Sequence, residues 1–449
     1  MTLPLQEVAA AIGAVPPPVA AAISHWSIDS RTCEPGALFF ALRGEHHDGH
    51  QYLGDVFQRG AAAAVVEKAI AGDFLQLQVK DTLAALTGAA TWARTKSAMT
   101  SIAVTGSAGK TTTKDTIAQL LSVEFETGRS GGNLNNHIGL PLSILRISDT
   151  ARAAVFEMGM NHAGEIRRLA SIAKPGIGVV TNVGYAHIEN FDSIESIAAA
   201  KGELIDSLPS GGIAVLNADD PRVAALAARH PGRTITFGLH ENAAMRAQAV
   251  EYLPQGVRFT LNGIEFESAL TGRIGVLNIL AGIAVAQAMG IAPERLKDAV
   301  RSLAPGKMRG ERSLVRGITV LNDCYNSNPD AARAMLEVLR SQPARRRIAV
   351  LGEMRELGRW AEPLHRGVGI YAAQCGISVL VGIRGAACHM VDEARRAGME
   401  DGAAYFFDEP EEAGYLVRQI AAAGDVVLFK GSRGTHVERA LERFTEPLP

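Results

Sequence analysis

Residues 105–112, TGSAGKTT, follow the apolar run SIAV and precede a pattern typical of a helix. Backbone N–H groups at the start of a helix, together with the positive end of the helix dipole, favour a bound phosphate. A standard phosphate-binding loop has the form G-x-x-x-x-G-K-[ST], but Val104 stands here at the position of its first glycine. The loop is therefore a shortened variant, and the sequence predicts that it holds nucleotide phosphates.

Residue types within this loop each have a chemical use. Gly106 and Gly109 let the backbone approach a phosphate closely, and Lys110 supplies a positive point charge. Thr111 or Thr112 offers a hydroxyl group to Mg²⁺. A glycine-rich turn with a surface lysine is the alternative interpretation. The predicted nucleotide-binding residues of the loop are Thr105, Gly106, Ser107, Ala108, Gly109, Lys110, Thr111 and Thr112.

Three titratable residues lie within or directly after apolar segments of the sequence. Glu157 ends the run AAVFE, where a buried carboxylate is costly unless its charge is satisfied. Because open parallel sheets bind ligands at the carboxyl ends of their strands, Glu157 is predicted to bind Mg²⁺ near the phosphates. His187 follows the run IGVVTNV, and Lys201 lies on a small, apolar helix face. The alternatives are a helix-start charge for the glutamate, a packing histidine and a lysine that lies along the surface.

Polar residues also gather at later junctions between strands and helices. The segment GGNLNNHIGLPLSIL contains Asn135 and Asn136, which could bind amides or phosphate oxygens, although asparagine-rich loops are also common turns. Asp323 follows one apolar run of the last third of the chain, and Lys430 and Arg433 follow another. These junctions predict a ligand-binding surface in the last third of the chain, but the spacing of the residues does not identify the ligand.

Apolar runs and helical patterns alternate along most of the chain, which is typical of an α/β fold. The strands predicted in the middle of the chain lie within residues 101–106, 153–159, 177–183 and 212–220. Because these runs are nearly continuous in Val and Ile, they predict a parallel sheet covered by helices on both faces. A hairpin with its turn at Asn262-Gly263 interrupts the alternation, and a second alternating unit begins near Leu314. The predicted domains are residues 1–82, 83–313 and 314–449.

Bulk composition argues against several other classes of protein. Lys plus Arg number 45 against 47 for Asp plus Glu, which gives no electrostatic reason to expect nucleic acid or a membrane surface as a partner. No apolar stretch approaches the roughly 18 residues of a membrane span, and the N-terminal segment with Glu7 does not resemble a secretory signal. The four cysteines are scattered without metal-type spacing, so a reduced, cytoplasmic protein is expected.

In their order along nearly the whole chain, these elements resemble the Mur ligases, which build the peptide stem of the bacterial cell-wall precursor. The segments that carry the resemblance are SIDSRTCEPGALFFALRGEHHDGHQYL, TGSAGKTTTK, GNLNNHIGLPLSIL, EMGMNHAGEI, TNVGYAHIENF, AKGEL, NADD, DCYNSNP, LGEMRELG and KGSR. The resemblance implies a small N-terminal α/β domain for a UDP-sugar and a central parallel-sheet ATPase domain with the phosphate loop. It also implies a C-terminal Rossmann-like α/β domain for an incoming dipeptide.

The resemblance also implies roles for single residues. Lys110 and the loop amides would hold the ATP phosphates, Thr111 and Glu157 would bind one Mg²⁺, and His187 would bind a second. Lys201 matches a family lysine that CO₂ carbamylates, which would turn a cation into an anionic Mg²⁺ ligand. The catalytic set implied in this way is Lys110, Glu157, His187 and Lys201.

Further nucleotide and substrate residues follow from the same resemblance. Asn278 matches an adenine-contacting asparagine, and Arg309 and Asp323 match residues that reach the nucleotide from the third domain. The predicted substrate-binding residues are Ser30, Arg31, Asp48, Gly49, His50, Asn135, Asn136, Tyr325, Asn326, Lys430 and Arg433. The chain departs from the family pattern at Ile274-Gly275, usually His-Asn, at Asn322, usually Asp, and at Met308, usually Gly.

The expected function is an ATP-dependent amide ligase. It would join D-alanyl-D-alanine to UDP-N-acetylmuramoyl-tripeptide through an acyl phosphate, as a cytoplasmic monomer, and give the pentapeptide precursor of peptidoglycan. The third residue of the tripeptide, meso-diaminopimelate or lysine, stays open. A sibling Mur ligase or a folylpolyglutamate-type ligase is the close alternative, and a nucleotide-driven switch protein is the alternative from another class.

Overall fold

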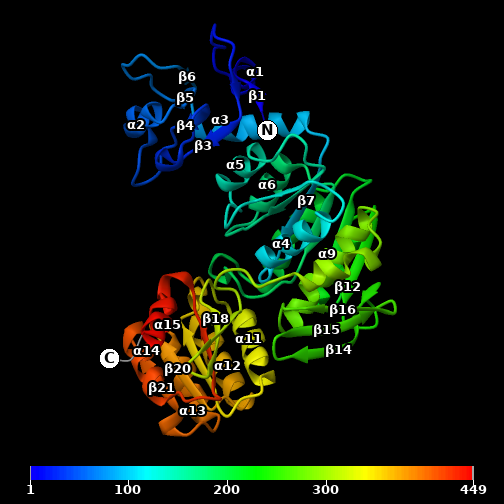
Figure 1. Cartoon of the computed structure of the whole chain (residues 1–449), viewed down its shortest axis with the longest axis vertical. Coiled ribbons are helices and arrows are strands. Elements are labelled where there is room, and N and C mark those ends of the chain that lie inside the picture. The colour runs from blue at the N-terminus through cyan, green and yellow to red at the C-terminus, as the bar shows by residue number, and fades with distance from the viewer. Residues whose placement is uncertain (1, 447–449) are drawn as a thin grey trace.

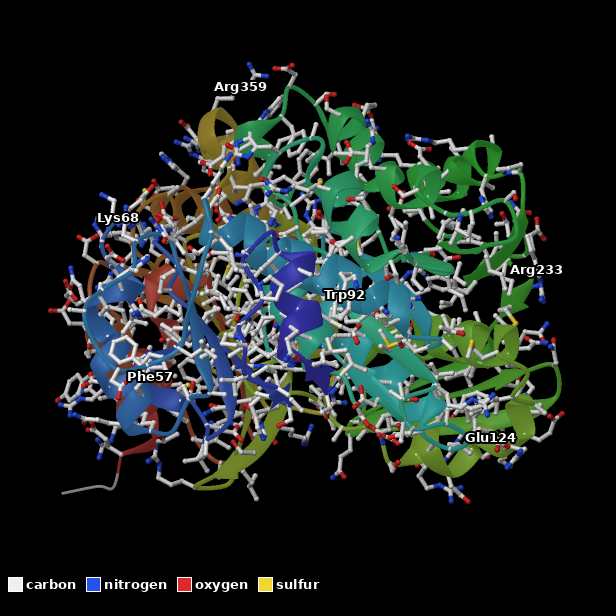
Figure 2. All side chains as sticks on the ribbon, turned by 90° about the horizontal axis from the view of Figure 1, so that it is seen from above. Phe57, Lys68, Trp92, Glu124, Arg233 and Arg359 are labelled. Carbon is white, nitrogen blue, oxygen red and sulfur yellow. The ribbon has the colours of Figure 1, made fainter. Side chains whose placement is uncertain are left out.

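The computed structural model describes residues 2–446 of the chain. Three groups of strands follow one another from the N-terminus to the C-terminus, with the central group between the other two (Figure 1). Charged side chains such as Lys68, Glu124, Arg233 and Arg359 lie at the periphery of the molecule (Figure 2). Within the described residues, no helix is both long and apolar enough to cross a membrane.

The N-terminal sheet has four parallel strands in the order β3-β4-β5-β6. Their bounds are β3 His25–Ser27, β4 Ala37–Phe40, β5 Ala63–Val66 and β6 Gln76–Gln78. The two middle strands are buried along their whole length. The helices of this region are α1 Leu5–Ala11, α2 Leu53–Gln58 and α3 Thr82–Lys96. Helix α3 begins with Asp81 as its cap and contacts the helix Gly139–Leu145 (α5) of the central region.

The central sheet has seven parallel strands in the order β13-β12-β11-β10-β7-β9-β8. The four Val- and Ile-rich runs form β7, β9, β10 and β11 and are parallel, as predicted. The bounds are β7 Thr100–Thr105, β8 Thr127–Arg129, β9 Ala153–Glu157, β10 Ile177–Val180, β11 Ile213–Asn217, β12 Arg233–Gly238 and β13 Met245–Arg246. Alternate residues of β7, β9, β10 and β11 pack into two separate apolar clusters, one on each face of the sheet. The prediction of a sheet covered on both faces is therefore confirmed.

Helices supply the two apolar layers that cover this sheet. On one face lie α4 Lys110–Leu121 and α9 Gly272–Ala288, and on the other α5 Gly139–Leu145, α6 Glu165–Ala173 and α7 Ile194–Asp206. Helix α9 is apolar around most of its circumference, and most of its residues are buried, as is typical of a helix in a protein core. Its position against α4 places Asn278 beside the phosphate loop.

A three-stranded antiparallel sheet is attached to the central region: β14 Gln248–Leu253, β15 Gly256–Leu261 and β16 Ile264–Ser268. The turn between the last two strands is Asn262-Gly263, as predicted, with φ of 52° and 80°. Both angles lie in the left-handed region, which two-residue hairpin turns of this kind require and which Asn and Gly tolerate.

The C-terminal sheet has six strands in the order β17-β18-β22-β19-β20-β21. The bounds are β17 Glu311–Val315, β18 Ile318–Asp323, β19 Arg347–Gly352, β20 Val379–Ile383, β21 Ala404–Phe407 and β22 Val426–Lys430. All pairs are parallel except β17 with β18. The principal helices are α11 Pro329–Ser341, α12 Ala361–Gln374, α13 Ala387–Arg396, α14 Pro410–Ile420 and α15 Val437–Thr445. The predicted domain boundary at 313 falls within β17, and the domain limits stay a prediction.

Candidate active site

The phosphate loop joins β7 to α4 at the carboxyl end of the central sheet. Gly109 has φ of 78°, in the left-handed region that favours glycine, and a Cβ there would lie 2.8 Å from Asn278 Oδ1. A Cβ at Gly106 would collide with the hydroxyl oxygen of Thr181. Both positions therefore need glycine, and the loop packs tightly on β10 and α9.

A neighbouring strand end holds the loop in shape. The side chain of Asn182 accepts hydrogen bonds from the N–H groups of Ser107 and Ala108, at 3.1 Å and 2.8 Å. Thr181 Oγ1 donates to the carbonyl of Ala108 at 2.8 Å, and Asn182 Nδ2 donates to the same oxygen at 3.0 Å. Two of the loop amides expected at phosphate thus point at an amide oxygen of the protein. Sequence reasoning missed Asn182, although it stands in the segment TNVG at the end of a strand.

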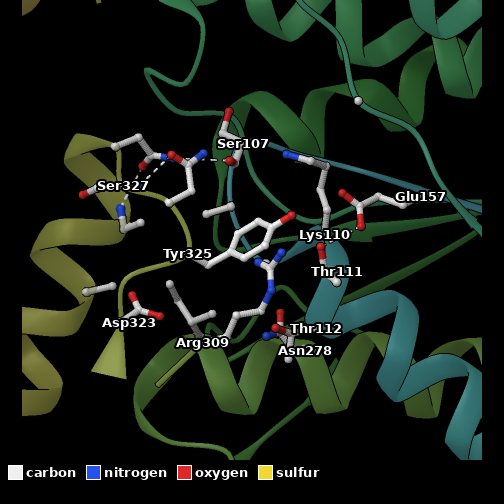
Figure 3. A pocket seen from close by; sticks show the side chains of 18 of the residues that line it. Ser107, Lys110, Thr111, Thr112, Glu157, Asn278, Arg309, Asp323, Tyr325 and Ser327 are labelled. Atoms are coloured by element: carbon white, nitrogen blue, oxygen red, sulfur yellow. Dashed lines mark hydrogen bonds between the residues drawn. The ribbon is translucent and has the colours of Figure 1, made fainter. Parts of the chain in front are cut away.

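The first helical residues bring a cation and a hydroxyl group to a buried carboxylate. Lys110 Nζ donates to the Gly106 carbonyl at 2.8 Å, and burial lowers the pKa of this amine. Thr111 Oγ1 donates to Glu157 Oε2 at 2.7 Å, and Asn135 Nδ2 donates to Glu157 Oε1 at 2.9 Å. Glu157 is only 3% exposed. Figure 3 shows Lys110, Thr111 and Glu157 together on one side of the cavity.

Lys201 lies in the middle of α7 and is 2% exposed. Burial, and then the charge of nearby Lys110, lowers the pKa of its amine well below the usual value. No hydrogen bond or ion pair joins this amine to another residue in the part of the chain that the structure describes. Two residues further along α7, Glu203 accepts the N–H groups of Gly164 and Arg167 at 2.7 Å and 3.1 Å. This carboxylate, which sequence reasoning missed, ties the lysine-bearing helix to the start of α6.

The C-terminal sheet supplies the facing wall. Lys430 Nζ, at the end of β22, lies 2.6 Å from Asp323 Oδ2 at the end of β18, and it donates to the Asn326 carbonyl at 2.9 Å. The Arg309 guanidinium stacks 3.8 Å from the centre of the Tyr325 ring. Figure 3 shows this pair between Asp323 and Lys110.

A cavity of about 600 Å³ lies between these two walls. The predicted residues that line it are Ser107, Ala108, Gly109, Lys110, Thr111, Thr112, Asn135, Asn136, Glu157, His187, Asn278, Arg309, Asp323, Tyr325, Asn326 and Lys430. Those that do not line it are Thr105, Gly106, Lys201, Arg433 and the five from the N-terminal sheet. The fold thus gathers residues that are up to 323 positions apart, from Ser107 to Lys430, around one space.

Contacts across the cavity were also absent from the sequence-based expectations. Asn328 caps α11 and donates from Nδ2 to the Ser107 carbonyl at 3.3 Å. Asp330 Oδ2 accepts the N–H of Tyr185 at 3.0 Å. Burial raises the pKa of the Asp330 carboxyl, while this hydrogen bond opposes the rise. The first turn of α11 therefore rests on the loops that follow β7 and β10.

The candidate residues of the N-terminal sheet have local partners. Asp48 caps a short helical turn by accepting the N–H of His50 at 3.0 Å, and its carboxylate lies 2.6 Å from His50 Nδ1. The other ring nitrogen of His50 accepts the N–H of Glu67 at 2.9 Å. A Cβ at Gly49 would lie 2.9 Å from the backbone of Ala41. These three predicted substrate residues thus have structural uses, and their substrate contacts stay a prediction.

Ser30 and Arg31 form a turn on the same sheet. Arg31 pairs with Asp29 at 2.7 Å, and its side chain is 84% exposed. Among the described residues, Asp29 is the ion-pair partner of this guanidinium. Because the side chain is largely exposed, Arg31 remains accessible to a ligand.

Two departures from the family pattern have local explanations. Met308 has φ of 58°, in the left-handed region that favours glycine, and its N–H donates to Glu311 Oε2 at 2.6 Å. Asn322 Nδ2 donates to the same carboxylate oxygen at 3.2 Å. Asn278 Oδ1 accepts from Thr113 Oγ1 at 2.9 Å, so its carbonyl already has a partner within the central domain.

The fold and the phosphate loop together define a nucleotide-binding α/β protein. Three family models match successive parts of the chain: "Mur ligase family, catalytic domain" at residues 22–92, "Mur ligase middle domain" at 104–286 and "Mur ligase, glutamate ligase domain" at 308–433. The chain belongs to the Mur ligase family.

Similar proteins carry one recurring name. The UDP-N-acetylmuramoyl-tripeptide–D-alanyl-D-alanine ligases of Bacillus subtilis (strain 168) and Escherichia coli (strain K12) are each 33% identical over 93% of this chain. The matches cover 92% and 93% of those two proteins. MurF from Acinetobacter baumannii superposes with a TM-score of 0.91 at 29% identity, covering 100% of this chain and 99% of that one.

Two further solved structures bear on the nucleotide and on the alternatives. MurF ligase from Thermotoga maritima in complex with ADP gives a TM-score of 0.83 at 27% identity, covering 94% of this chain and 97% of that one. Folylpolyglutamate synthase from Mycobacterium tuberculosis gives 0.64 at 16% identity, covering 82% and 94%, and that likeness shows the shared fold alone.

Proposed function

We propose that this chain joins D-alanyl-D-alanine to the free carboxylate of UDP-N-acetylmuramoyl-tripeptide at the expense of ATP. The observation that carries the proposal is the cavity in which Lys110, Thr111 and Glu157 face Arg309, Asp323 and Lys430 from another sheet. The relatives that match nearly the whole chain are named for this ligation, and one solved relative holds ADP.

The reaction needs an activated acyl group because a carboxylate repels nucleophiles. An oxygen of the tripeptide carboxylate attacks the γ-phosphorus of ATP, and ADP leaves with the electrons of the broken P–O bond. The amine of D-alanyl-D-alanine then attacks the acyl carbon, phosphate leaves, and the amine gives up a proton. Lys110 stabilises the negative charge on the phosphoryl group, and removal of water from the closed cavity protects the acyl phosphate.

Mg²⁺ fits the donors present at the loop. Thr111 and Glu157 offer oxygen ligands side by side, and among the described residues no group of three or more His, Cys, Asp or Glu could hold a metal on its own. Few protein ligands combined with phosphate oxygens and water are typical of Mg²⁺ in phosphoryl transfer. Bound there, Mg²⁺ would neutralise charge on the phosphates. His187 is the candidate ligand of a second ion.

Carbamylation fits the surroundings of Lys201. The reaction with CO₂ needs a neutral amine, and burial beside Lys110 disfavours the ammonium form. A carbamate would replace repulsion between two buried cations with attraction. This agrees with an amine that has no partner among residues 2–446. Lys201 would act on the metal site from α7 as an anionic ligand.

The remaining assignments complete the proposal. The N-terminal domain, residues 1–82, binds the UDP-sugar through Ser30, Arg31 and residues 48–50. The C-terminal domain, residues 314–449, binds the dipeptide with Tyr325, Asn326, Lys430 and Arg433, and the central domain, 83–313, binds ATP. Residues of a single chain line the cavity, which supports a monomeric enzyme, and a cytoplasmic location is part of the same proposal.

The test is phosphate release from Mg·ATP by purified protein, with the UDP-linked tripeptide and D-alanyl-D-alanine added separately and together. We expect release only with both, matched by an equal amount of UDP-N-acetylmuramoyl-pentapeptide. Tripeptides ending in meso-diaminopimelate and in lysine are compared to identify the third residue. Activity with an amino acid but not the dipeptide would identify a sibling ligase, and turnover indifferent to both substrates would favour a switch protein.

A further inference from the structure

Two loops from different sheets meet at the edge of the nucleotide cavity. Residues 185–192 follow β10 of the central sheet, and residues 354–360 follow β19 of the C-terminal sheet. The N–H of Glu189 donates to the Glu356 carbonyl at 3.2 Å, and Arg359 donates to the Asp192 carbonyl at 3.1 Å. A Cβ at Gly358 would lie 2.9 Å from Cβ of Glu189, so the two loops pack closely.

A histidine and a carboxylate face each other at this junction. Glu356 Oε2 lies 2.5 Å from His187 Nδ1, although the direction of approach does not make an aligned hydrogen bond. Both residues have φ of 62°, in the left-handed region. A non-glycine residue in this region is strained and persists only where its surroundings require it. Two residues with unfavourable backbone conformations therefore face each other at this junction, one from each loop.

The chemistry of imidazole gives this pairing a meaning. His187 also lines the cavity, together with the phosphate-loop residue Lys110. A carboxylate beside Nδ1 favours the tautomer that carries its proton there, and the lone pair of Nε2 is then free for an electrophile. The carboxylate that does this for His187 comes from the other sheet, 169 residues further along the chain.

We propose that Glu356 is a positioning residue that fixes the orientation and the tautomer of the His187 ring. The lone pair of His187 Nε2 is then held in place for an electrophile only when the C-terminal domain lies against the central domain. The proposal rests on the proposed function for its kinetic consequence, but its structural part concerns the tautomer alone. Docking of the C-terminal domain would then complete the His187 side of the site as well as enclose the substrates. Glu356 itself need not touch ATP or either peptide.

The test uses two substitutions of Glu356 and one matched control in the full-length protein. Glu356→Gln keeps the size of the side chain and removes its charge, and Glu356→Asp keeps the carboxylate. Glu189→Gln removes a carboxylate from the same junction, where the side chain is exposed and the structure gives it no contact with the His187 ring. Each protein is labelled with ¹⁵N-histidine, and the His187 ring signals are assigned by their loss in His187→Gln.

We expect wild-type His187 to give the ¹⁵N shifts of the Nδ1–H tautomer, and Glu356→Gln to shift them toward a mixture of tautomers. Glu189→Gln should leave them unchanged. In the ligase assay, Glu356→Gln should lower kcat about 10- to 100-fold, the range for loss of a group that orients a metal-binding histidine, with little change in the KM for ATP. Glu356→Asp should recover part of that loss.

The proposal is overturned if the His187 shifts are the same in Glu356→Gln and wild type, or if Glu189→Gln moves them equally. It is also overturned if Glu356→Gln raises the KM for ATP and leaves kcat intact. If Glu356→Gln does not fold, the shifts of Glu356→Asp decide the point. A wild-type protein without ligase activity would refute the proposed function instead, since the ¹⁵N shifts report the tautomer without turnover.

Discussion

The central and N-terminal sheets place polar residues at similar positions but use them differently. At the central sheet, the buried Lys201 amine has no hydrogen-bond or ion-pair partner among the described residues, and its charged neighbour, Lys110, has the same sign. At the N-terminal sheet, Asp48 and His50 satisfy each other and the backbone around them. A buried charge without an opposite charge is expensive, so it marks a place where a ligand is expected. Satisfied polar groups mark local structure.

The largest expected effect is a loss of activity from a substitution in the central region. Lys110→Ala removes the positive charge that lies against the phosphate loop, and we expect kcat to fall by roughly 10³-fold, by analogy with the loss of a transition-state donor. The same substitution at the exposed Lys68 serves as the control. Phosphate release and circular dichroism are measured for both variants. A folded Lys110→Ala protein with near-normal turnover would contradict the assignment of the loop.

The next effect concerns stability in the N-terminal region. Asp48→Ala removes the cap of a short turn and the partner of His50, and we expect the free energy of unfolding to fall by about 1–2 kcal/mol. Urea denaturation measures the change, and the KM for the UDP-linked tripeptide is followed at a temperature where the variant remains folded. Unchanged stability with a strongly raised KM would mean that Asp48 serves the ligand rather than the fold.

Arg31 provides the reverse case in the same region. Because its side chain is largely exposed, we expect Arg31→Ala to leave the unfolding midpoint unchanged. If the guanidinium contacts the UDP-sugar, the KM for that substrate should rise about 10-fold, which corresponds to one charge-assisted hydrogen bond. Arg59→Ala, another arginine of this region, is the control. Equal KM values for both variants would remove Arg31 from the substrate site.

The smallest expected effect is a pH dependence at the contact between α11 and the β10 loop. Burial raises the pKa of Asp330 above its usual value, so the folded protein binds this proton more tightly than the unfolded chain. Stability from this group is therefore largest below the usual aspartate pKa and decreases as pH rises through the raised value. Asp330→Asn should flatten this part of the stability–pH curve, measured by urea denaturation at several pH values. An unchanged slope would show that Asp330 titrates normally.

Much of the fold could be predicted because its signals are local. The buried runs of β7, β9, β10 and β11 and the Asn262-Gly263 turn were all identified from short segments. Strand β17, with sequence ERSLV, was missed because it is an exposed edge strand paired on one side only. Its residues carry little apolar patterning, and pairing with β18 alone makes them a strand.

Only those residues of the candidate site that lie in recognisable sequence motifs were predicted. Glu157 ends β9, and Lys110 lies in the loop–helix junction after the neighbouring parallel strand β7, so their proximity followed from the parallel sheet. Asn182 and Asn328 were missed because each acts on a loop residue 74 and 221 positions away, respectively. An asparagine in a turn looks the same in sequence whether or not it reaches such a partner.

By itself the sequence determined the strand–loop–helix units, the glycines that the phosphate loop requires and the order of the motifs that identify the family. These are decided by backbone sterics and apolar periodicity over a few residues. Only the tertiary structure decided that Lys201 lies near Lys110, that Asn182 shapes the phosphate loop and that Glu356 reaches His187. Burial, pKa shifts and contacts across domains depend on which distant atoms exclude water, and that information exists only after the chain has packed.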